Sequence, residues 1–412
     1  MFVGPSQWCL ATWLLIPYRL PSGWAPPFGD NDLPPMPRLS GQLGRAAALM
    51  RKEWVLTISL AACVLLASAN RAMFGRLMTM PLLPLTSVAL FILIIAAYLS
   101  VVRHAEALGR RLGEPLGTLV LTLSVVIVEV ASVSAVMVHG DNNPTLVSDT
   151  LLAVIMIILN GMVGVSLLLG GWVHREQNYN LQGANAYMSV IIPLAVLSLI
   201  LPVFTQTTPG PTLPIYQQLF LAAAAVGLYF IFLAVQTGRH REFFSTGESL
   251  AAPAEIELTA SAPSALRSTL CLVLYLVPVV YLVELLAHPI DYLIETLHAP
   301  TALGGVIIGV VVATPEALGA TKAAMGNQIQ RSINISLGSV LSTIGLTIPA
   351  MLLIGQFTER PFQLGLEHTD IVMLLLTLFC SCVTFASGRS NILQGCVHTL
   401  LFAAYVLLIF RD

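Results

Sequence analysis

Charged residues are scarce in this sequence of 412 residues: Asp, Glu, Lys and Arg make up only 10%, whereas hydrophobic residues make up 56%. A water-soluble domain of this size needs a much more polar surface, so the composition excludes a soluble fold and indicates a polytopic membrane protein. The 19 Lys and Arg residues stand singly or in pairs, and no basic stripe is available to neutralise the phosphates of a nucleic acid. We therefore expect membrane lipid as a partner and no nucleic acid.

Cysteine is scarce as well, and five of the six cysteines fall within apolar segments: Cys63, Cys271, Cys380, Cys382 and Cys396. We expect these to pack as small apolar side chains and not to build a disulfide framework. Cys380 and Cys382 point to different faces of a helix and have no paired Cys or His beside them, so we expect no zinc or redox site. The motifs G-x-S-x-G and H-E-x-x-H and a pair of membrane aspartates are absent, so we expect no enzyme.

Long apolar runs, in contrast, are abundant. From Trp54 onward, segments of about 17 to 25 residues recur between short polar breaks, and this length spans a bilayer as a helix. We predict eleven membrane helices, at residues 54–70, 81–102, 115–138, 148–171, 187–204, 216–237, 268–287, 300–325, 333–355, 369–386 and 391–410.

Residues 1–52 differ from everything after them, because eight prolines up to Pro37 break any helix before it could span a bilayer. We expect a poorly ordered, dispensable extension, with Met50 as an alternative start, so that residues 1–49 would be absent from the native protein. Four parts follow: residues 53–80 with the first helix and a loop, a five-helix group at 81–238, an acidic cytoplasmic linker at 239–267, and a second five-helix group at 268–412.

Positive charge sets the expected orientation. With the N-terminus in the cytoplasm, twelve Lys and Arg residues fall on the inner side and four on the outer side, as the positive-inside rule requires. Eleven helices then place the C-terminus on the external side of a bacterial inner membrane. The outer loops carry acidic residues, among them Asp149, Glu367 and Asp370, which either concentrate cations at an entrance or are ordinary solvated loop residues.

Two glutamates lie deep inside apolar runs: Glu129 and Glu316, each on the second helix of its five-helix group. An ionisable group at the middle of a membrane span costs roughly 2.5 to 3.5 kcal/mol, so such a residue is usually functional. Because five is odd, the two groups must cross the membrane with opposite polarity, which brings the glutamate helices face to face, as in inverted-repeat transporters. We therefore predict an all-α fold of one N-terminal helix plus two inverted five-helix repeats, with one shared cation or proton site. A protonated carboxyl bonded to a neighbouring helix is the structural alternative.

Neutral oxygens beside the glutamates would complete such a site. The candidates are hydroxyl and amide side chains in segments of small residues, although each is also a common helix-packing residue: Ser124, Asn160, Thr314, Ser339, Ser342 and Thr343. Pro315 lacks a backbone donor, so we expect a helix break there that frees carbonyl oxygens next to Glu316. Lys322 is expected as a snorkelling anchor, and Glu284 and His398 as satisfied structural groups with a proton relay as the alternative.

At these residues the chain resembles the calcium/cation antiporter superfamily, and more closely its bacterial calcium/proton antiporter branch of the ChaA type. The likeness covers residues 55 to 410 and includes Ser124-Val-Val-Ile-Val-Glu129, Ser166-Leu-Leu-Leu-Gly-Gly171, Pro315-Glu-Ala-Leu-Gly-Ala320, Asn327-Gln-Ile-Gln-Arg331 and Gly338-Ser-Val-Leu341. The resemblance implies a secondary transporter that expels calcium, or sodium or potassium, in exchange for protons, with Glu129 and Glu316 as its functional glutamates. Related exchangers usually place Gly-Asn before the acidic residue, where this chain has Ile127-Val128 and Thr314-Pro315, and this departure leaves monovalent ions open.

The residues themselves suggest how exchange would work. Two carboxylates together bind one divalent metal ion, here calcium, or accept two protons and become neutral, so cation and protons compete for the same oxygens. Calcium prefers six to eight oxygens, so hydroxyls, carbonyls or water must help. A sodium or potassium/proton antiporter using the same site is the alternative, and a cation channel lined by the same glutamates is another. We expect no resident cofactor, because calcium ions and protons would be transported substrates.

Overall fold

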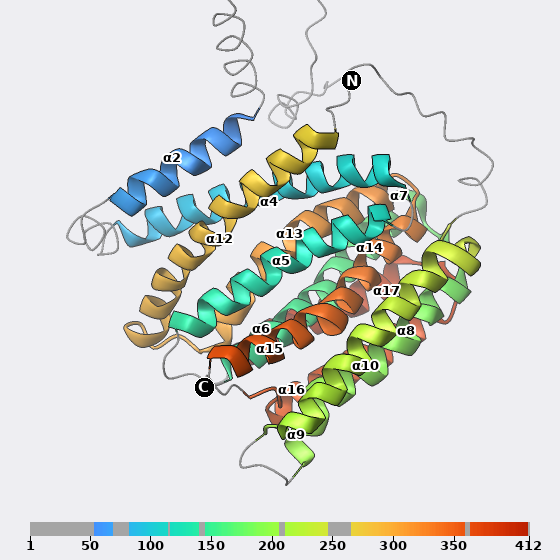
Figure 1. Cartoon of the computed structure of the whole chain (residues 1–412). Coiled ribbons are helices and arrows are strands. Elements are labelled where there is room, and N and C mark those ends of the chain that lie inside the picture. The colour runs from blue at the N-terminus through green and yellow to red at the C-terminus, as the bar shows by residue number, and fades with distance from the viewer. Residues whose placement is uncertain are drawn as a thin grey trace, which may run out of the picture. The chain divides into compact units, whose positions relative to one another are not determined.

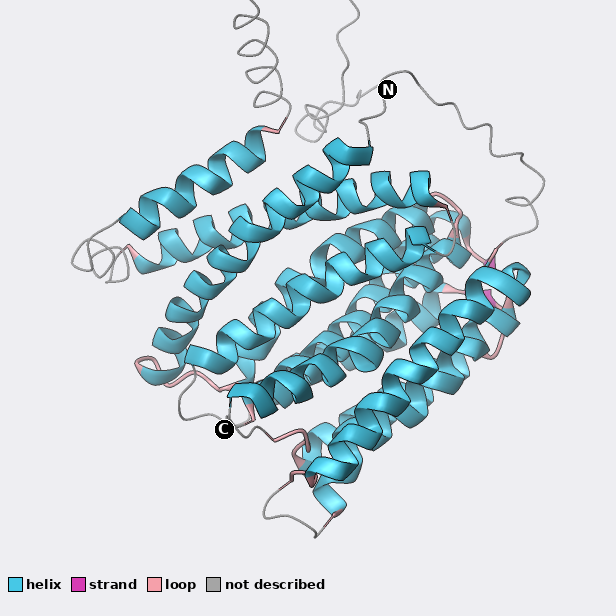
Figure 2. Ribbon diagram, viewed as in Figure 1, coloured by secondary structure: helices cyan, strands magenta, loops and turns pink. Residues whose placement is uncertain are grey.

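The computed structural model describes residues 53–68, 82–113, 116–139, 145–205, 211–245, 265–358 and 363–410. Within them, ten helical spans are long and apolar enough to cross a membrane, and one shorter apolar helix, α2 (Trp54–Ser68), precedes these. The prediction of an all-α polytopic membrane protein is thus confirmed (Figure 2). Ten of the eleven predicted membrane helices are long enough to span a bilayer, whereas the first, predicted at 54–70, is the shorter helix α2. The expectations for residues 1–52 lie outside the described residues.

Each half of the chain contributes five helical spans. Those of the first half are α4 (Leu83–Leu112), α5 (Leu116–His139), α6–η1–α7 (Leu146–Met156, Ile157–Met162, Val163–His174), α8–η2–α9 (Leu181–Ala195, Val196–Ile200, Leu201–Phe204) and α10–η3 (Ile215–Ala234, Val235–Arg239). Those of the second half are α12 (Ala265–Glu295), α13 (Ala302–Met325), α14–η5–α15 (Ile329–Ser342, Thr343–Thr347, Ile348–Thr358), α16 (His368–Phe385) and α17 (Ile392–Ile409). The third span of each half contains a π-helical segment, η1 or η5, and such segments are frequent at functional sites.

A short strand pair shows that the halves have opposite polarity. Strand β1 (Gln177–Asn178) follows the third span of the first half, and β2 (Arg389–Ser390) follows the fourth span of the second half. The two strands pair antiparallel, with Gln177 opposite Ser390. The third span of one half therefore ends on the same side as the fourth span of the other, which occurs only if the two halves run in opposite directions.

Several helices are longer than their apolar runs. Helix α4 continues to Leu112, α12 spans Ala265–Glu295 through Pro278 and Pro289, and α8 begins at Leu181 instead of residue 187. The early start of α8 has a local cause, because the Asn180 side chain accepts a hydrogen bond from the Gln182 backbone N–H and caps the helix. Hydropathy marks the membrane-spanning part of a helix, whereas capping residues set its ends.

The start of the expected linker at 239–267 is packed. Residues Arg241–Phe244 form the 3₁₀ helix η4, and the Phe244 side chain is buried against the rings of Tyr187 and Phe232. The apolar pair Phe243-Phe244 explains this docking, because exposed aromatic rings gain from burial. Residues 246–264 lie outside the described part of the chain, and α12 already begins at Ala265.

The two glutamate helices lie between the other spans (Figure 1). Helices α2, α4 and α12 pack together, α13 packs against α6 and α14, and α5 contacts both α4 and η5. Helix α13 approaches α6 closely because it presents Gly305 and Gly309 to it. A Cβ atom at Gly305 would lie only 2.9 Å from the Thr150 backbone nitrogen.

Candidate cation site

The two membrane glutamates occupy matching places in the two halves. Glu129 lies on α5 and is only 1% exposed, whereas Glu316 lies on α13 and is partly exposed to a cavity. The negative charge of Glu129 interacts unfavourably with the Glu316 carboxylate, so the two groups lie close enough for each to affect the charge of the other. Helices from opposite halves thus bring both carboxyl groups to one region of the protein core.

A single span of the second half holds both carboxylates. The Ser339 hydroxyl on α14 donates a hydrogen bond to Glu316 Oε2 at 2.5 Å, and the Thr347 hydroxyl at the end of η5 donates to Glu129 Oε2 at 2.7 Å. Thr343 also interacts with the Glu129 carboxyl. Ser339, Thr343 and Thr347 recur every four residues, so their hydroxyls follow one side of the span.

Tyr98 is a third polar group beside the glutamates. Its side chain on α4 is fully buried in a core cluster with Val125 and Val312, the residues one turn before Glu129 and Glu316. Both carboxylate charges act on the Tyr98 hydroxyl. Among the described residues, neither this hydroxyl nor the buried Glu129 Oε1 has a hydrogen-bond partner. Each unpaired buried group costs about 1–3 kcal/mol, and a cation bound between these oxygens would offset that cost.

The expected supporting ligands divide into two groups. Ser339 and Thr343 lie at the carboxylates, whereas the hydroxyls of Ser124, Thr314 and Ser342 donate to backbone carbonyls of their own spans. Sequence reasoning missed Thr347 and Tyr98. The four-residue spacing from Thr343 was a signal for Thr347, but no pattern marked Tyr98, because its proximity to both glutamates depends on tertiary packing.

Asn160 faces a different polar network. Its amide nitrogen donates to the Thr377 hydroxyl at 2.7 Å, and its oxygen pairs with His398 Nδ1 at 3.1 Å. His398 Nε2 pairs with the Thr384 hydroxyl at 3.0 Å, so both ring nitrogens have partners. This arrangement joins η1 to α16 and α17 and fits the structural role expected for His398. Glu284 and Lys322 are both exposed.

The helix break expected at Pro315 is wrong, because α13 is one continuous helix from Ala302 to Met325 with Pro315 inside it. The irregular backbone next to the glutamates is instead the π-helical turn η5, which contains both Thr343 and Thr347. A wide turn re-aims side chains without interrupting the span.

A cavity of about 230 Å³ leads to Glu316 from the end of the bundle where α13 ends and α14 begins, which we call the Arg331 end. Its lining includes Glu316, Ser339, Gln236 and, at the mouth, Glu106 and the exposed Arg331. Glu129 is not among the lining residues. The cavity therefore reaches one member of the glutamate pair and leaves the other enclosed.

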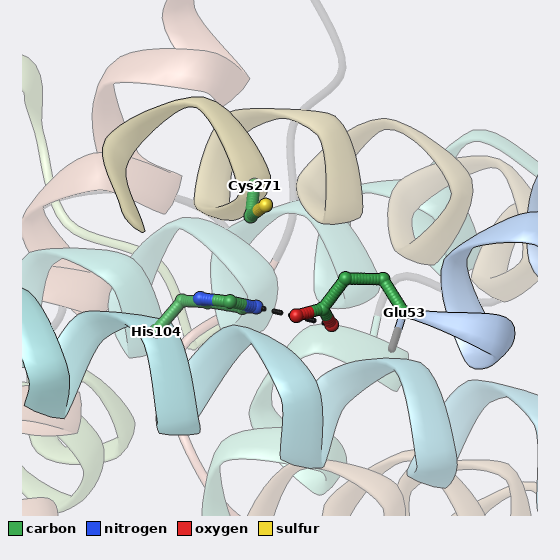
Figure 3. A group of neighbouring side chains, drawn as sticks. All are labelled: Glu53, His104 and Cys271. Carbon is green, nitrogen blue, oxygen red and sulfur yellow. Dashed lines mark hydrogen bonds and ion pairs between the residues drawn. The ribbon is translucent and has the colours of Figure 1, made fainter. Parts of the chain in front are cut away.

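A second cluster of polar groups surrounds Glu53, and it too was missed by sequence reasoning (Figure 3). Glu53, His104 and Cys271 offer ligand atoms within 4.8 Å of one another, a spacing that suits a metal ion. However, Glu53 Oε2 already accepts from Arg103 at 2.6 Å and from the Tyr275 hydroxyl at 3.2 Å, and Arg267 lies 3.7 Å from Oε1. Two guanidinium charges disfavour a cation there. This cluster is therefore an ion-pair network that links α2, α4 and α12.

We expect Glu53→Gln to weaken this ion-pair network, because glutamine keeps the shape of the side chain but loses the charge with which the two arginines pair. The loss of charge-assisted hydrogen bonds costs about 2 kcal/mol, so the thermal unfolding midpoint in detergent should fall. Exchange by the protein that remains folded should be unchanged. An unchanged midpoint would contradict a stabilising role.

The two repeats coincide with a known family pattern. Residues 82–238 and 267–411 match the family described as sodium/calcium exchanger protein. The chain is 40% identical over 331 residues to the putative ionic transporter y4hA of Sinorhizobium fredii, which covers 79% of this chain and 90% of that protein. It is 37% identical over 340 residues to the sodium-potassium/proton antiporter ChaA of Escherichia coli, which covers 82% and 92% respectively. The solved structure of native YfkE shares the fold, with a TM-score of 0.65 at 18% identity over 87% of this chain and 100% of that chain.

Proposed function

Because this chain belongs to the sodium/calcium exchanger protein family, a family of transporters and not of enzymes, we propose that it exports calcium ions in exchange for protons through one site built on Glu129 and Glu316. The observation that carries the proposal is that two carboxylates from opposite halves are held by hydroxyls of one span, through Ser339 and Thr347. Two carboxylates offset the charge of one divalent cation, and two protons neutralise the same pair. Cation and protons therefore compete for one site, which is the requirement for exchange.

Alternating access is part of the proposal. Glu316 lines the cavity from the Arg331 end, whereas Glu129 is enclosed, so this conformation opens the site towards the Arg331 end. We place the Arg331 end in the cytoplasm, because the expected inner side carries most Lys and Arg residues. In this orientation the protein lies in a bacterial inner membrane with its C-terminus outside, and calcium loads from the cytoplasm.

A monovalent cation is the second candidate substrate. The relative from Escherichia coli is named a sodium-potassium/proton antiporter, and relatives from Synechocystis and Aphanothece halophytica are named Ca(2+)/H(+) antiporters. Hydroxyl oxygens such as those of Ser339 and Thr347 ligate sodium as well as calcium, so the site chemistry permits both.

Proton flux in proteoliposomes tests these candidates. Purified protein is reconstituted with a pH-sensitive dye inside, a pH gradient is imposed, and Ca²⁺, Na⁺ or K⁺ is added separately, with choline as the control. Calcium export predicts that Ca²⁺ alone dissipates the gradient at low concentration, whereas a response only to Na⁺ or K⁺ supports the monovalent alternative. A cation current that needs no proton counterflow would indicate a channel, and no response to any cation would overturn the proposal.

Tyr98→Phe should weaken cation binding at this site. The substitution removes one buried oxygen next to both carboxylates and leaves the ring packing intact, so the apparent KM for the cation should rise roughly tenfold. The matched control is Tyr275→Phe, since Tyr275 is equally buried but its hydroxyl donates to Glu53. The control should keep the wild-type KM, and equal KM values in both variants would remove Tyr98 from the site.

A further inference from the structure

A second cavity lies at the opposite end of the bundle, where α6, α13 and α16 begin and α17 ends. It has a volume of about 380 Å³, and its polar lining consists of Asp149, His298, Thr301, Glu367, Asp370 and Tyr405. We call it the acidic cavity. Both halves of the chain form it, because Asp149 comes from the first half and the other residues from the second. None of these side chains belongs to the glutamate site.

The carboxylates alone have an ordinary explanation. Asp149 and Asp370 lie in the first turns of α6 and α16, and Glu367 is the N-cap residue of α16. A negative charge stabilises the N-terminus of a helix by about 0.3–1 kcal/mol. That effect accounts for each residue singly. It does not account for their convergence on one cavity, where the charges of Asp370 and Glu367 act unfavourably on Asp149.

Tyr405 is the observation that points to a ligand. Its side chain lines the acidic cavity and is only 3% exposed. Its hydroxyl makes no hydrogen bond with any described residue, although the charges of Asp149 and Asp370 reach it. Because the side chain is buried and yet lines the cavity, its hydroxyl oxygen is placed to meet a ligand held there.

We propose that the acidic cavity binds a hydrated divalent cation, at a site separate from Glu129 and Glu316. Carboxylate and phenol oxygens are hard ligands of the kind that calcium prefers. The volume leaves room for several water molecules, so the ion keeps part of its hydration shell. A divalent ion offsets the mutual repulsion of the acidic groups more fully than a monovalent ion does. This inference does not depend on which cation the protein transports.

Calcium binding in a background without the central carboxylates isolates the acidic cavity. We measure equilibrium binding of radioactive Ca²⁺ to the full-length Glu129→Gln/Glu316→Gln protein in detergent. This variant should retain saturable Ca²⁺ binding that excess Na⁺ does not displace. Adding Asp149→Asn should lower the affinity by at least about tenfold, because a direct charged ligand is lost. Adding Tyr405→Phe, which preserves packing, should lower it several-fold.

The control for these variants is Glu295→Gln in the same background. Glu295 is an exposed carboxylate at the end of α12 and does not line the acidic cavity, so its replacement should leave the affinity unchanged. Three results would overturn the proposal: no Ca²⁺ binding in the double variant, binding that Na⁺ competes away equally well, or binding that is unaffected by both Asp149→Asn and Tyr405→Phe. If Asp149→Asn does not fold, the isosteric Tyr405→Phe variant still decides the question.

Discussion

Glu129→Gln and Glu316→Gln are each expected to abolish cation/proton exchange without preventing insertion of the protein. Glutamine keeps the shape of the side chain and can still accept the hydrogen bond from Thr347 or Ser339. It cannot take up and release a proton, and it cannot offset the charge of a bound cation. Removing one charged partner of a buried ion typically costs 3–5 kcal/mol, so exchange in proteoliposomes should fall at least about 100-fold.

The comparison variant for this experiment is Glu284→Gln. Glu284 is an exposed carboxylate on α12, and its replacement should leave exchange at the wild-type rate. Loss of exchange in Glu284→Gln would instead support the alternative in which this residue relays protons. Near-normal exchange in either Glu129→Gln or Glu316→Gln would remove the proposed site, provided that expression and elution in detergent match those of the wild type.

The sequence predicts the helices well because a bilayer imposes a strong local constraint. Every span needs a continuous apolar run, and an odd number of spans in each half dictates opposite polarity. The apolar runs and the number of spans can be read directly from the sequence, and so can the two glutamates that interrupt the runs. Hydropathy does not reveal irregular backbone within a span, because a π-helical turn such as η5 changes the hydrogen bonding of the backbone without changing the hydropathy of the segment.

The composition of the site is harder to predict, because most hydroxyls in apolar helices bond to their own backbone. Ser124, Thr314 and Ser342 do so, whereas Ser339 and Thr347 reach across to a carboxylate. The four-residue spacing that these two share with Thr343 shows that their hydroxyls follow one side of the span, but not what that side meets. The difference arises from which helix lies opposite. The effect of Pro315 also depends on its surroundings, because a long, well-packed membrane helix can accommodate a proline without a break.

The close contact between α13 and α6 yields the second large expected effect: Gly305→Ala should destabilise the protein and impair exchange. A Cβ atom at Gly305 would lie 2.9 Å from the backbone nitrogen and Cα of Thr150, and helix backbone cannot move aside as a flexible side chain can. Gly309 lies one turn further along and meets Val154 and Ile157 of the same span, so this is a small-xxx-small interface of the kind that membrane helices use.

The direction in which the thermal unfolding midpoint changes when glycine is replaced by alanine tests this close contact. Alanine favours a helix over glycine by about 1 kcal/mol, so a glycine without close neighbours should be improved by the substitution. A Cβ atom added at Gly227 on α10 would meet no neighbouring atom within 4 Å, and Gly227→Ala should hold or raise the thermal midpoint in detergent. Gly305→Ala should lower it, since overpacking costs about 1–3 kcal/mol, and should slow exchange by displacing the helix that carries Glu316. If both variants raise the midpoint, α6 and α13 do not approach each other this closely in the membrane.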